Sequence, residues 1–288
     1  MIRYASSSKQ STFRSDYALS NGQIAHYAPS VMASEAHHSR GDKYSFIPTI
    51  QVIDSLRDEG FEPYEIRQTL VRNADKREHT KHMVRMRHVN AITSQEEVPE
   101  IILLNSHDGT SSYQIMSGVF RFVCSNGLIA GDLFENIRIR HSGNVVNDVI
   151  EGATRILKES DEVFERIGTY KGINLTYDES NALAVAAAQV RWGDEAPVNA
   201  IQLLTPHRYA DRKTDLWTTF NRIQENVLKG GVAGKSTTGR RTTTRAVGGV
   251  NENVKLNKAL WTLADKMATL KLDKATDEFI ARHDHSFA

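Results

Sequence analysis

The run Leu104-Asn105-Ser106-His107-Asp108-Gly109 places reactive side chains directly after an apolar stretch. A histidine beside an aspartate has the residue types of a general base with an orienting carboxylate, or of two metal ligands. Neighbouring strand residues point to opposite faces, however, and the chain contains no HExxH or CxxC spacing. Asn, Ser, Asp and Gly in succession are typical of tight turns. We therefore predict a structural turn with no catalytic residue, no metal and no cofactor, formed by Asn105, Ser106, His107, Asp108 and Gly109.

Arginines recur at alternate positions in two other stretches. Arg85 and Arg87 lie on one face of a predicted strand, and Arg138 and Arg140 lie on one face of another. If the two strands share a sheet and a face, four guanidinium groups form a patch suited to a phosphate backbone. The alternative is the ordinary solvent face of an antiparallel sheet.

The segment Lys229 to Val250 combines flexibility with positive charge. It contains six glycines, a run of threonines and five basic residues, with no acidic residue. Such a composition buries too little apolar surface to order itself, which predicts a flexible loop. Basic side chains on a mobile backbone can contact phosphates, and each neutralised phosphate releases counterions. The segment therefore fits either a solvated linker or a nucleic-acid contact made by Lys235, Arg240, Arg241 and Arg245.

Periodicity predicts the elements that carry these residues. Alternating patterns joined by short polar turns favour strands in an antiparallel meander, and apolar residues three and four positions apart favour helices. The stretch 110–123 fits either a helix or a strand. The predicted strands cover residues 64–71, 81–89, 100–104 and 136–141, and the predicted helices cover 49–59, 145–168, 182–192, 215–228 and 254–272.

Together these elements predict an α+β fold. Its antiparallel sheet spans about residues 62 to 141 and packs against the helices near 49–59 and 145–168, and the C-terminal half is largely helical. Unpaired edges of such a sheet favour self-association into a homo-oligomer. The predicted organisation is a polar arm at 1–45, a core domain at 46–228, the basic loop at 229–250, and a C-terminal helix and tail at 251–288.

Composition indicates the compartment of the protein and the partners that it is expected to have. The 288 residues carry 36 basic and 35 acidic side chains, so the net charge of +1 does not by itself indicate a polyanionic partner. The single cysteine, Cys124, excludes an internal disulfide and fits a reducing compartment, where we expect it to be a buried thiol. No apolar run approaches the roughly 20 residues that span a bilayer. These features predict a cytoplasmic protein without a membrane partner.

Several motifs resemble one family. Leu104 to Gly109, Phe120 to Leu128 and Ile137 to His141 are similar to the phage/plasmid-like protein family, as are 216–221 and 224–226 further on. The similarity covers roughly residues 45 to 270, and Arg121 and Asn126 lie within its motifs. The family is generally described as a domain of unknown function, so the resemblance supplies no catalytic residue. It implies an origin in phages, prophages and conjugative plasmids, near genes of replication, recombination or counter-defence.

The leading hypothesis is a non-enzymatic nucleic-acid-binding protein of a mobile element, one that binds or anneals single-stranded DNA. Phosphate contacts would come from the arginine patch and the basic loop. One alternative is a counter-defence protein that binds and inhibits a host immune effector. A second alternative is a metalloenzyme that depends on His107 and Asp108.

Overall fold

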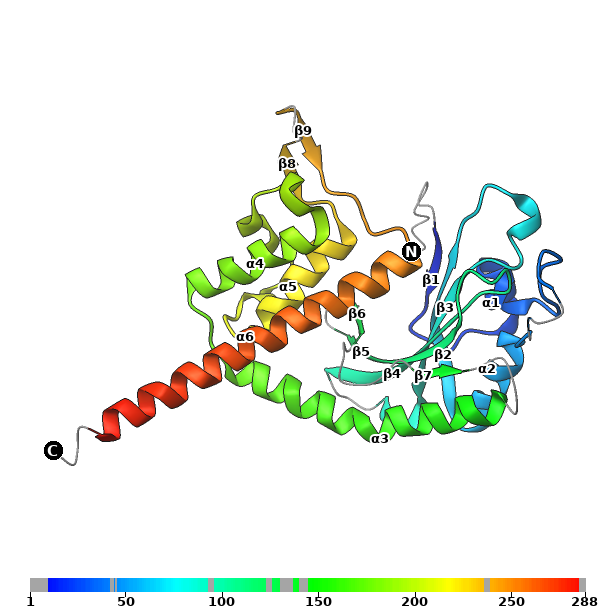
Figure 1. The fold of residues 1–288 in the computed structure, drawn as a ribbon, viewed down its shortest axis with the longest axis horizontal. Coiled ribbons are helices and arrows are strands. Elements are labelled where there is room, and N and C mark those ends of the chain that lie inside the picture. Colours follow the sequence, from blue (N-terminus) through cyan, green and yellow to red (C-terminus); the bar gives the residue numbers. More distant parts are fainter. Residues whose placement is uncertain are drawn as a thin grey trace. The chain divides into compact units, whose positions relative to one another are not determined.

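The computed structural model describes residues 10–41, 44, 46–92, 96–122, 126–129, 137–139, 145–235 and 239–284 (Figure 1). The chain forms two compact units: unit 1 comprises residues 1–161 and 248–254, and unit 2 comprises residues 162–247 and 255–288. The fold is α+β, as the sequence predicts, with the main sheet in unit 1. The chain passes between the units after residues 161, 247 and 254, and the first of these points falls inside the segment 46–228, which the sequence predicts to be one domain.

In the described residues, unit 1 contains a seven-stranded antiparallel sheet, which confirms the predicted meander. Six strands lie side by side in chain order, and β7 pairs with β5. Residues 118–121 of β5 pair with β6 and residues 113–115 pair with β7, so two short strands share one edge of β5. The strands are β1 (Gln10–Arg14), β2 (Phe61–Thr69), β3 (His82–His88), β4 (Glu97–Asn105), β5 (Tyr113–Arg121), β6 (Asn126–Ile129) and β7 (Ile137–Ile139).

One face of this sheet forms the main apolar core of unit 1. Alternate strand residues, among them Ile66, Val84 and Leu103, are buried there against helix residues such as Ile53 and Val149. The hydrophobic effect on this face holds the helices to the sheet. The helices of this region are α1 (Asn21–Tyr27), α2 (Thr49–Asp58) and the part of α3 (Val145–Gly172) up to residue 161, with 3-10 helices η1 (Pro29–Met32), η2 (Ala74–Lys76) and η3 (Val89–Ala91).

The opposite face carries a smaller apolar cluster beside charged side chains. Met83, Ile102 and Met116 pack there with Val250, the first residue of α6 (Val250–Asp284). Lys81 lies near this cluster, and its Nζ donates to Asn251 Oδ1 over 2.8 Å. The start of α6 therefore belongs to unit 1.

The described part of the predicted polar arm, residues 10–41, contains regular structure and contributes to the core. Residues 10–41 contain β1, α1 and η1, and Leu19, Ile24 and Val31 are fully buried in the core. Ser20 caps α1, because its Oγ accepts a hydrogen bond from the Gln23 backbone N–H while the Gln23 side chain accepts one from Ser20 N. A few well-placed apolar residues and one capping box thus order a polar segment.

Unit 2 is helical and has an aromatic core. The rings of Trp217 and Phe220 stack at 5.6 Å, and Trp261 meets Phe220 edge-on at 6.2 Å. A capping box between Thr176 and Glu179 begins α4. The two helices predicted near 182–192 and 215–228 are confirmed as α4 (Tyr177–Trp192) and α5 (Leu216–Lys229), accompanied by η4 (Gly193–Glu195), η5 (Ala200–Leu204) and η6 (Tyr209–Arg212).

The basic segment after α5 contains a β-hairpin where composition predicts an unstructured loop. Strands β8 (Ala233–Lys235) and β9 (Arg241–Thr243) pair antiparallel. At the base of the hairpin, the backbone N–H of Gly231 donates to Thr244 O and the N–H of Val247 donates to Leu228 O, both over 2.8 Å. Backbone hydrogen bonds therefore order a segment that has little apolar surface to bury. Among the described residues, no helix has the length and apolar character needed to cross a membrane.

Candidate functional site

Arg85 and Arg87 share one face of β3 as predicted, but they lie in the interior and not on a surface patch. Their exposed fractions are 0% and 2%. The carboxylate of Glu100 accepts hydrogen bonds from Arg85 Nε over 2.6 Å and from Arg87 Nε over 2.9 Å. The Arg87 guanidinium also lies 3.7 Å from the centre of the Phe120 ring, a cation–π contact. The predicted exposure of both arginines is therefore wrong. Both side chains are buried, and both form an ion pair with Glu100.

The same face carries a second buried carboxylate, that of Glu65. It forms ion pairs with Arg14 and Arg67, and register places Glu65 opposite Arg85. Burial alone would raise the pKa of Glu65, but the guanidinium groups of Arg67, Arg14 and Arg85 overcome it and hold the pKa far below its ordinary value. Basic and acidic side chains thus alternate on this face of the sheet, across strands β1 to β4.

Glycine makes room for the guanidinium group of Arg85. A Cβ atom on Gly127 would lie 2.5 Å from Arg85 Cζ, and one on Gly118 would lie 3.1 Å from Arg85 Nη2. Arg85 cannot move away freely, because its Nη2 donates to Leu128 O over 2.7 Å while its Nε is bound to Glu100. The glycine in the motif from Phe120 to Leu128 therefore has a steric role.

We expect Gly127→Ala to lower the free energy of unfolding of unit 1 by about 1–3 kcal/mol, the usual cost of overpacking. Hydrogen exchange of the β3 and β4 amides measures this loss. Gly41→Ala is the matched control, because a Cβ at Gly41 meets nothing within 4 Å. Equal protection in the two variants would contradict the steric role.

The run Asn105 to Gly109 forms the turn that its composition predicts. Asp108 Oδ1 accepts hydrogen bonds from Thr110 N over 3.1 Å and from Thr110 Oγ1 over 2.6 Å. Ser106 Oγ accepts a hydrogen bond from Ser111 N over 2.8 Å, and Gly109 has the positive φ of 75° that suits glycine. These side chains satisfy backbone groups of the turn.

The rings of His82 and His107 lie close together in the interior. They belong to a hydrogen-bond network that also contains Thr49 and Asn105. The rings of His82 and His107 lie 5.2 Å apart and are fully buried. Thr49 Oγ1 lies 2.9 Å from His82 Nε2 and 3.4 Å from His107 Nε2, and it accepts a hydrogen bond from Asn105 Nδ2 over 3.0 Å. Burial lowers the pKa of His82 to about 4, so the ring is neutral at pH 7. The Asp108 carboxylate accepts hydrogen bonds within the turn, whereas His107 Nε2 faces Thr49 in the buried network.

The other predicted residues of the sheet fall into two groups. Arg121 is buried, and its Nη2 forms an ion pair with Glu96 Oε1 at 3.0 Å. Arg138 pairs with Gln114 through its backbone, and Asn126 pairs with Arg121. The side chains of Arg138 and Asn126, together with the whole of Arg140 and Cys124, lie outside the described residues.

The basic hairpin presents the remaining predicted residues to solvent. Lys235, Arg240, Arg241 and Arg245 are all exposed. Within the described part of the chain, the side chains of Lys235, Arg241 and Arg245 form no ion pair with an acidic residue. Their charges are therefore available to an external anion.

A cavity of about 830 Å³ adjoins the hairpin. The hairpin is held against the loop before η5, since Lys235 N donates to Pro197 O over 2.8 Å. Gly234 is required at this contact, because a Cβ there would clash with Pro197 O. The polar and charged groups at the wall of this cavity are supplied by Asn199, Gln202, Lys235, Arg241 and Thr242.

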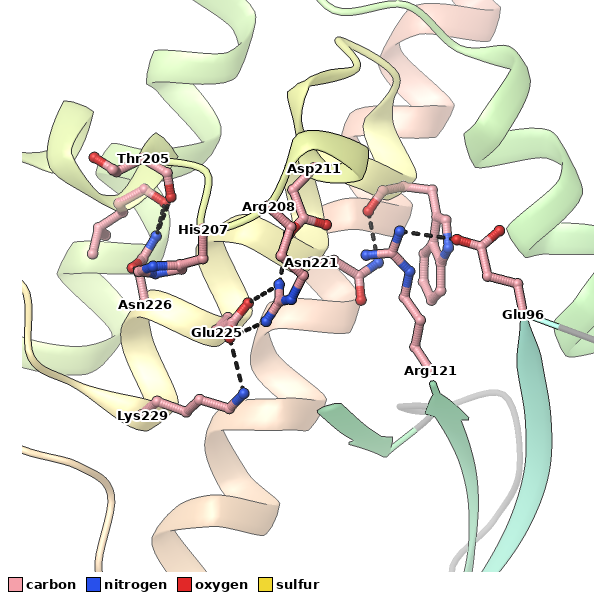
Figure 2. Close-up of polar contacts among 12 residues, drawn as sticks. Glu96, Arg121, Thr205, His207, Arg208, Asp211, Asn221, Glu225, Asn226 and Lys229 are labelled. Atoms are coloured by element: carbon pink, nitrogen blue, oxygen red, sulfur yellow. Dashed lines mark hydrogen bonds and ion pairs between the residues drawn. The ribbon is translucent and has the colours of Figure 1, made fainter. Parts of the chain in front are cut away.

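Figure 2 shows a polar network on α5, the helix that precedes the hairpin. The Glu225 carboxylate binds both terminal nitrogens of Arg208, at 2.6 and 2.8 Å, and accepts a hydrogen bond from Lys229 Nζ over 2.9 Å. Asn226 Nδ2 donates to Leu203 O over 2.9 Å. Glu225 and Asp211 together balance the charges of Arg208 and Lys229, so the exposed basic surface begins beyond α5, at Lys235.

Sequence reasoning missed Glu65 and Glu100, the acidic partners that make the buried arginines possible. A signal existed for Glu100, because the other residues of its predicted strand, 101–104, are all apolar. Their role becomes visible only with the strand register, which sets Glu65 opposite Arg85.

Comparison with known proteins adds family relationships to this geometry. The model of the family described as Domain of unknown function (DUF932) matches residues 36–261. The chain is 48% identical over 257 residues to the UPF0380 protein YafZ of Escherichia coli (strain K12). The aligned region covers 89% of this chain and 94% of YafZ. The UPF0380 protein YfjQ of the same organism shows the same identity and coverage. No solved structure matches the chain at a significant level.

Proposed function

The chain belongs to the DUF932 family, and we propose that it binds nucleic acid through the basic hairpin formed by β8 and β9. The observation that carries the proposal is the charge of this hairpin. Four exposed basic residues lie within 11 positions, and residues 229–251 contain no acid. Such a concentration of positive charge on a narrow element suits a phosphate backbone.

The wall of the adjoining cavity offers the other groups that a nucleotide needs. Lys235 and Arg241 supply positive charge for phosphate, and the amides of Asn199 and Gln202 can donate to and accept from sugar or base atoms. A volume of about 830 Å³ lies in the range typical of small-molecule sites. A strand that crosses the hairpin can therefore place one nucleotide in this cavity.

The buried arginines of the sheet take no part in this proposal. Arg85 and Arg87 are paired with Glu100 and lie beneath the surface, so a phosphate could reach them only after their ion pairs break. Phosphate contacts carry no sequence information, so binding that comes mainly from the basic residues of the hairpin should depend little on sequence, as in proteins that protect or anneal single strands. We place this activity in the replication or recombination of a phage or plasmid, the setting that the family resemblance implies.

We expect the triple variant Lys235→Ala/Arg241→Ala/Arg245→Ala to bind nucleic acid at least about tenfold more weakly at low salt. In a plot of log affinity against log salt concentration, the slope should be smaller in magnitude by about 2–3, because each lost phosphate contact reduces the slope by about one. Fluorescence anisotropy with labelled single-stranded DNA, double-stranded DNA and RNA, from 50 to 300 mM salt, measures both quantities.

The matched control is Arg72→Ala/Arg77→Ala/Lys158→Ala, which removes the same charge from exposed positions outside the hairpin. It should retain most of the affinity and slope. If both triple variants lose affinity equally, the hairpin is not the binding site. Absence of binding to all three nucleic acids at 50 mM salt would refute the function itself.

A further inference from the structure

Two histidines and one aspartate meet on unit 1, away from the hairpin. His37 and His38 follow η1, and Asp75 lies in η2 between β2 and β3. One ligand atom from each of the three residues lies within 4.8 Å of the others. His37 Nε2 lies 2.9 Å from Asp75 Oδ2, and His38 Nε2 lies 3.7 Å from the same oxygen.

We propose that His37, His38 and Asp75 bind a Zn²⁺ ion. Imidazole nitrogen and carboxylate oxygen are ordinary zinc ligands, and Zn²⁺ is commonly held by three protein ligands and a water molecule. An ion at ligand distances of about 2.0–2.2 Å needs donor atoms about 3–4 Å apart. The two distances to Asp75 Oδ2 match this span.

The surroundings hold His37 in position for this role. Its side chain is 3% exposed, and its Nδ1 lies 2.8 Å from Ser39 Oγ. Metal binding at Nε2 requires the ring proton on Nδ1, where the Ser39 hydroxyl can accept it. The Ser39 backbone N–H, which donates to Nδ1 over 3.2 Å, then gives up that hydrogen bond. The backbone of His37 is also fixed, because its N–H donates to His107 O over 3.0 Å. The first ligand is therefore buried, oriented and anchored to the Asn105–Gly109 turn.

The other two ligands, His38 and Asp75, lie at the surface and belong to two different segments of unit 1. The side chains of His38 and Asp75 are 75% and 55% exposed, so an ion can enter from solvent. The His79 ring lies 5.3 Å from that of His37 and stands beside the site. A bound ion would join residues 37–38 to the β2–β3 connection and so fasten the N-terminal segment to the sheet. Three protein ligands leave the fourth position of the ion open to water. The site is independent of the basic hairpin.

Equilibrium dialysis of the full chain without an affinity tag against Zn²⁺, followed by elemental analysis, should give one ion per chain. We expect His38→Ala and Asp75→Asn each to weaken binding at least about tenfold, the scale of losing one ligand. Both side chains are largely exposed, so the variants should keep the fold, which circular dichroism checks. Excess Zn²⁺ should raise the melting temperature of the unaltered chain by several degrees and leave both variants unchanged.

Two controls separate this site from other histidines. His26→Ala removes an exposed histidine elsewhere in unit 1, and His283→Ala/His285→Ala removes the C-terminal His-Asp-His sequence. Both should bind Zn²⁺ as the unaltered chain does. The proposal is overturned if dialysis shows no stoichiometric zinc, if only the C-terminal variant loses it, or if His38→Ala and Asp75→Asn retain full affinity.

Discussion

Replacing Glu100 by glutamine should lower the free energy of unfolding of unit 1 by about 3–5 kcal/mol, because it leaves two buried guanidinium groups without their shared anion. Arg85 and Arg87 both bind the Glu100 carboxylate through Nε, and all three side chains are at most 2% exposed. Neither arginine can relieve this by losing its charge, because a guanidinium group is not deprotonated in proteins. Neither can reach solvent without leaving the sheet face.

Hydrogen exchange of the β3 and β4 amides measures this loss within unit 1, whereas tryptophan fluorescence would not, because all three tryptophans lie in unit 2. Glu62→Gln is the matched control. Glu62 pairs with Arg57 at 3.3 Å and is 30% exposed, so its loss should cost about 1 kcal/mol or less. If the unpaired cations cause the damage, Arg85→Met/Arg87→Met/Glu100→Met should be more stable than Glu100→Gln. A triple variant no more stable than the single one would contradict this explanation.

The sequence predicts the strands of this region well and their environment poorly. Alternation places Arg85 and Arg87 on one face of β3, which the structure shows, but alternation is the same for a solvent face and for a buried face that carries charge. The difference depends on Glu65 and Glu100, which come from other strands. It also depends on Gly127, whose lack of a side chain creates the space for Arg85. These relations exist only once register is fixed.

The proposed sites show the same limit. The charge of the hairpin is visible in the sequence, because no acid interrupts its basic residues. Its order is not visible, since that depends on backbone hydrogen bonds, including the one from Lys235 N to Pro197 O. The histidine cluster cannot be found from local spacing, because His37 and Asp75 are 38 residues apart. Only the packing of the N-terminal segment against the β2–β3 connection brings them together.

Unit 1 should lose about 3 kcal/mol of stability as the pH falls from about 6.5 to about 4, because of His82 alone. His82 is fully buried, and burial lowers its pKa to about 4 from an ordinary value of 6.5, although its hydrogen bond to Thr80 O acts in the opposite direction. Between these two values the unfolded chain binds a proton that the folded chain excludes. The stabilising contribution is therefore complete above pH 6.5 and is lost progressively as the pH falls towards 4.

The difference between the unaltered chain and His82→Gln isolates this contribution. Glutamine can still bond to Thr49 and Ser30, the hydrogen-bond partners of His82, but it does not titrate. We expect the stability of the variant, measured by hydrogen exchange of β3 amides from pH 4.5 to 8, to vary much less across this window.

Carboxylates such as Glu65, whose pKa is lowered, are common to both proteins and weaken them only at more acidic pH, so they cancel in the comparison. His26→Gln, at an exposed position, should follow the unaltered chain. Parallel curves for the unaltered chain and His82→Gln would show that another group controls the acid sensitivity of the sheet.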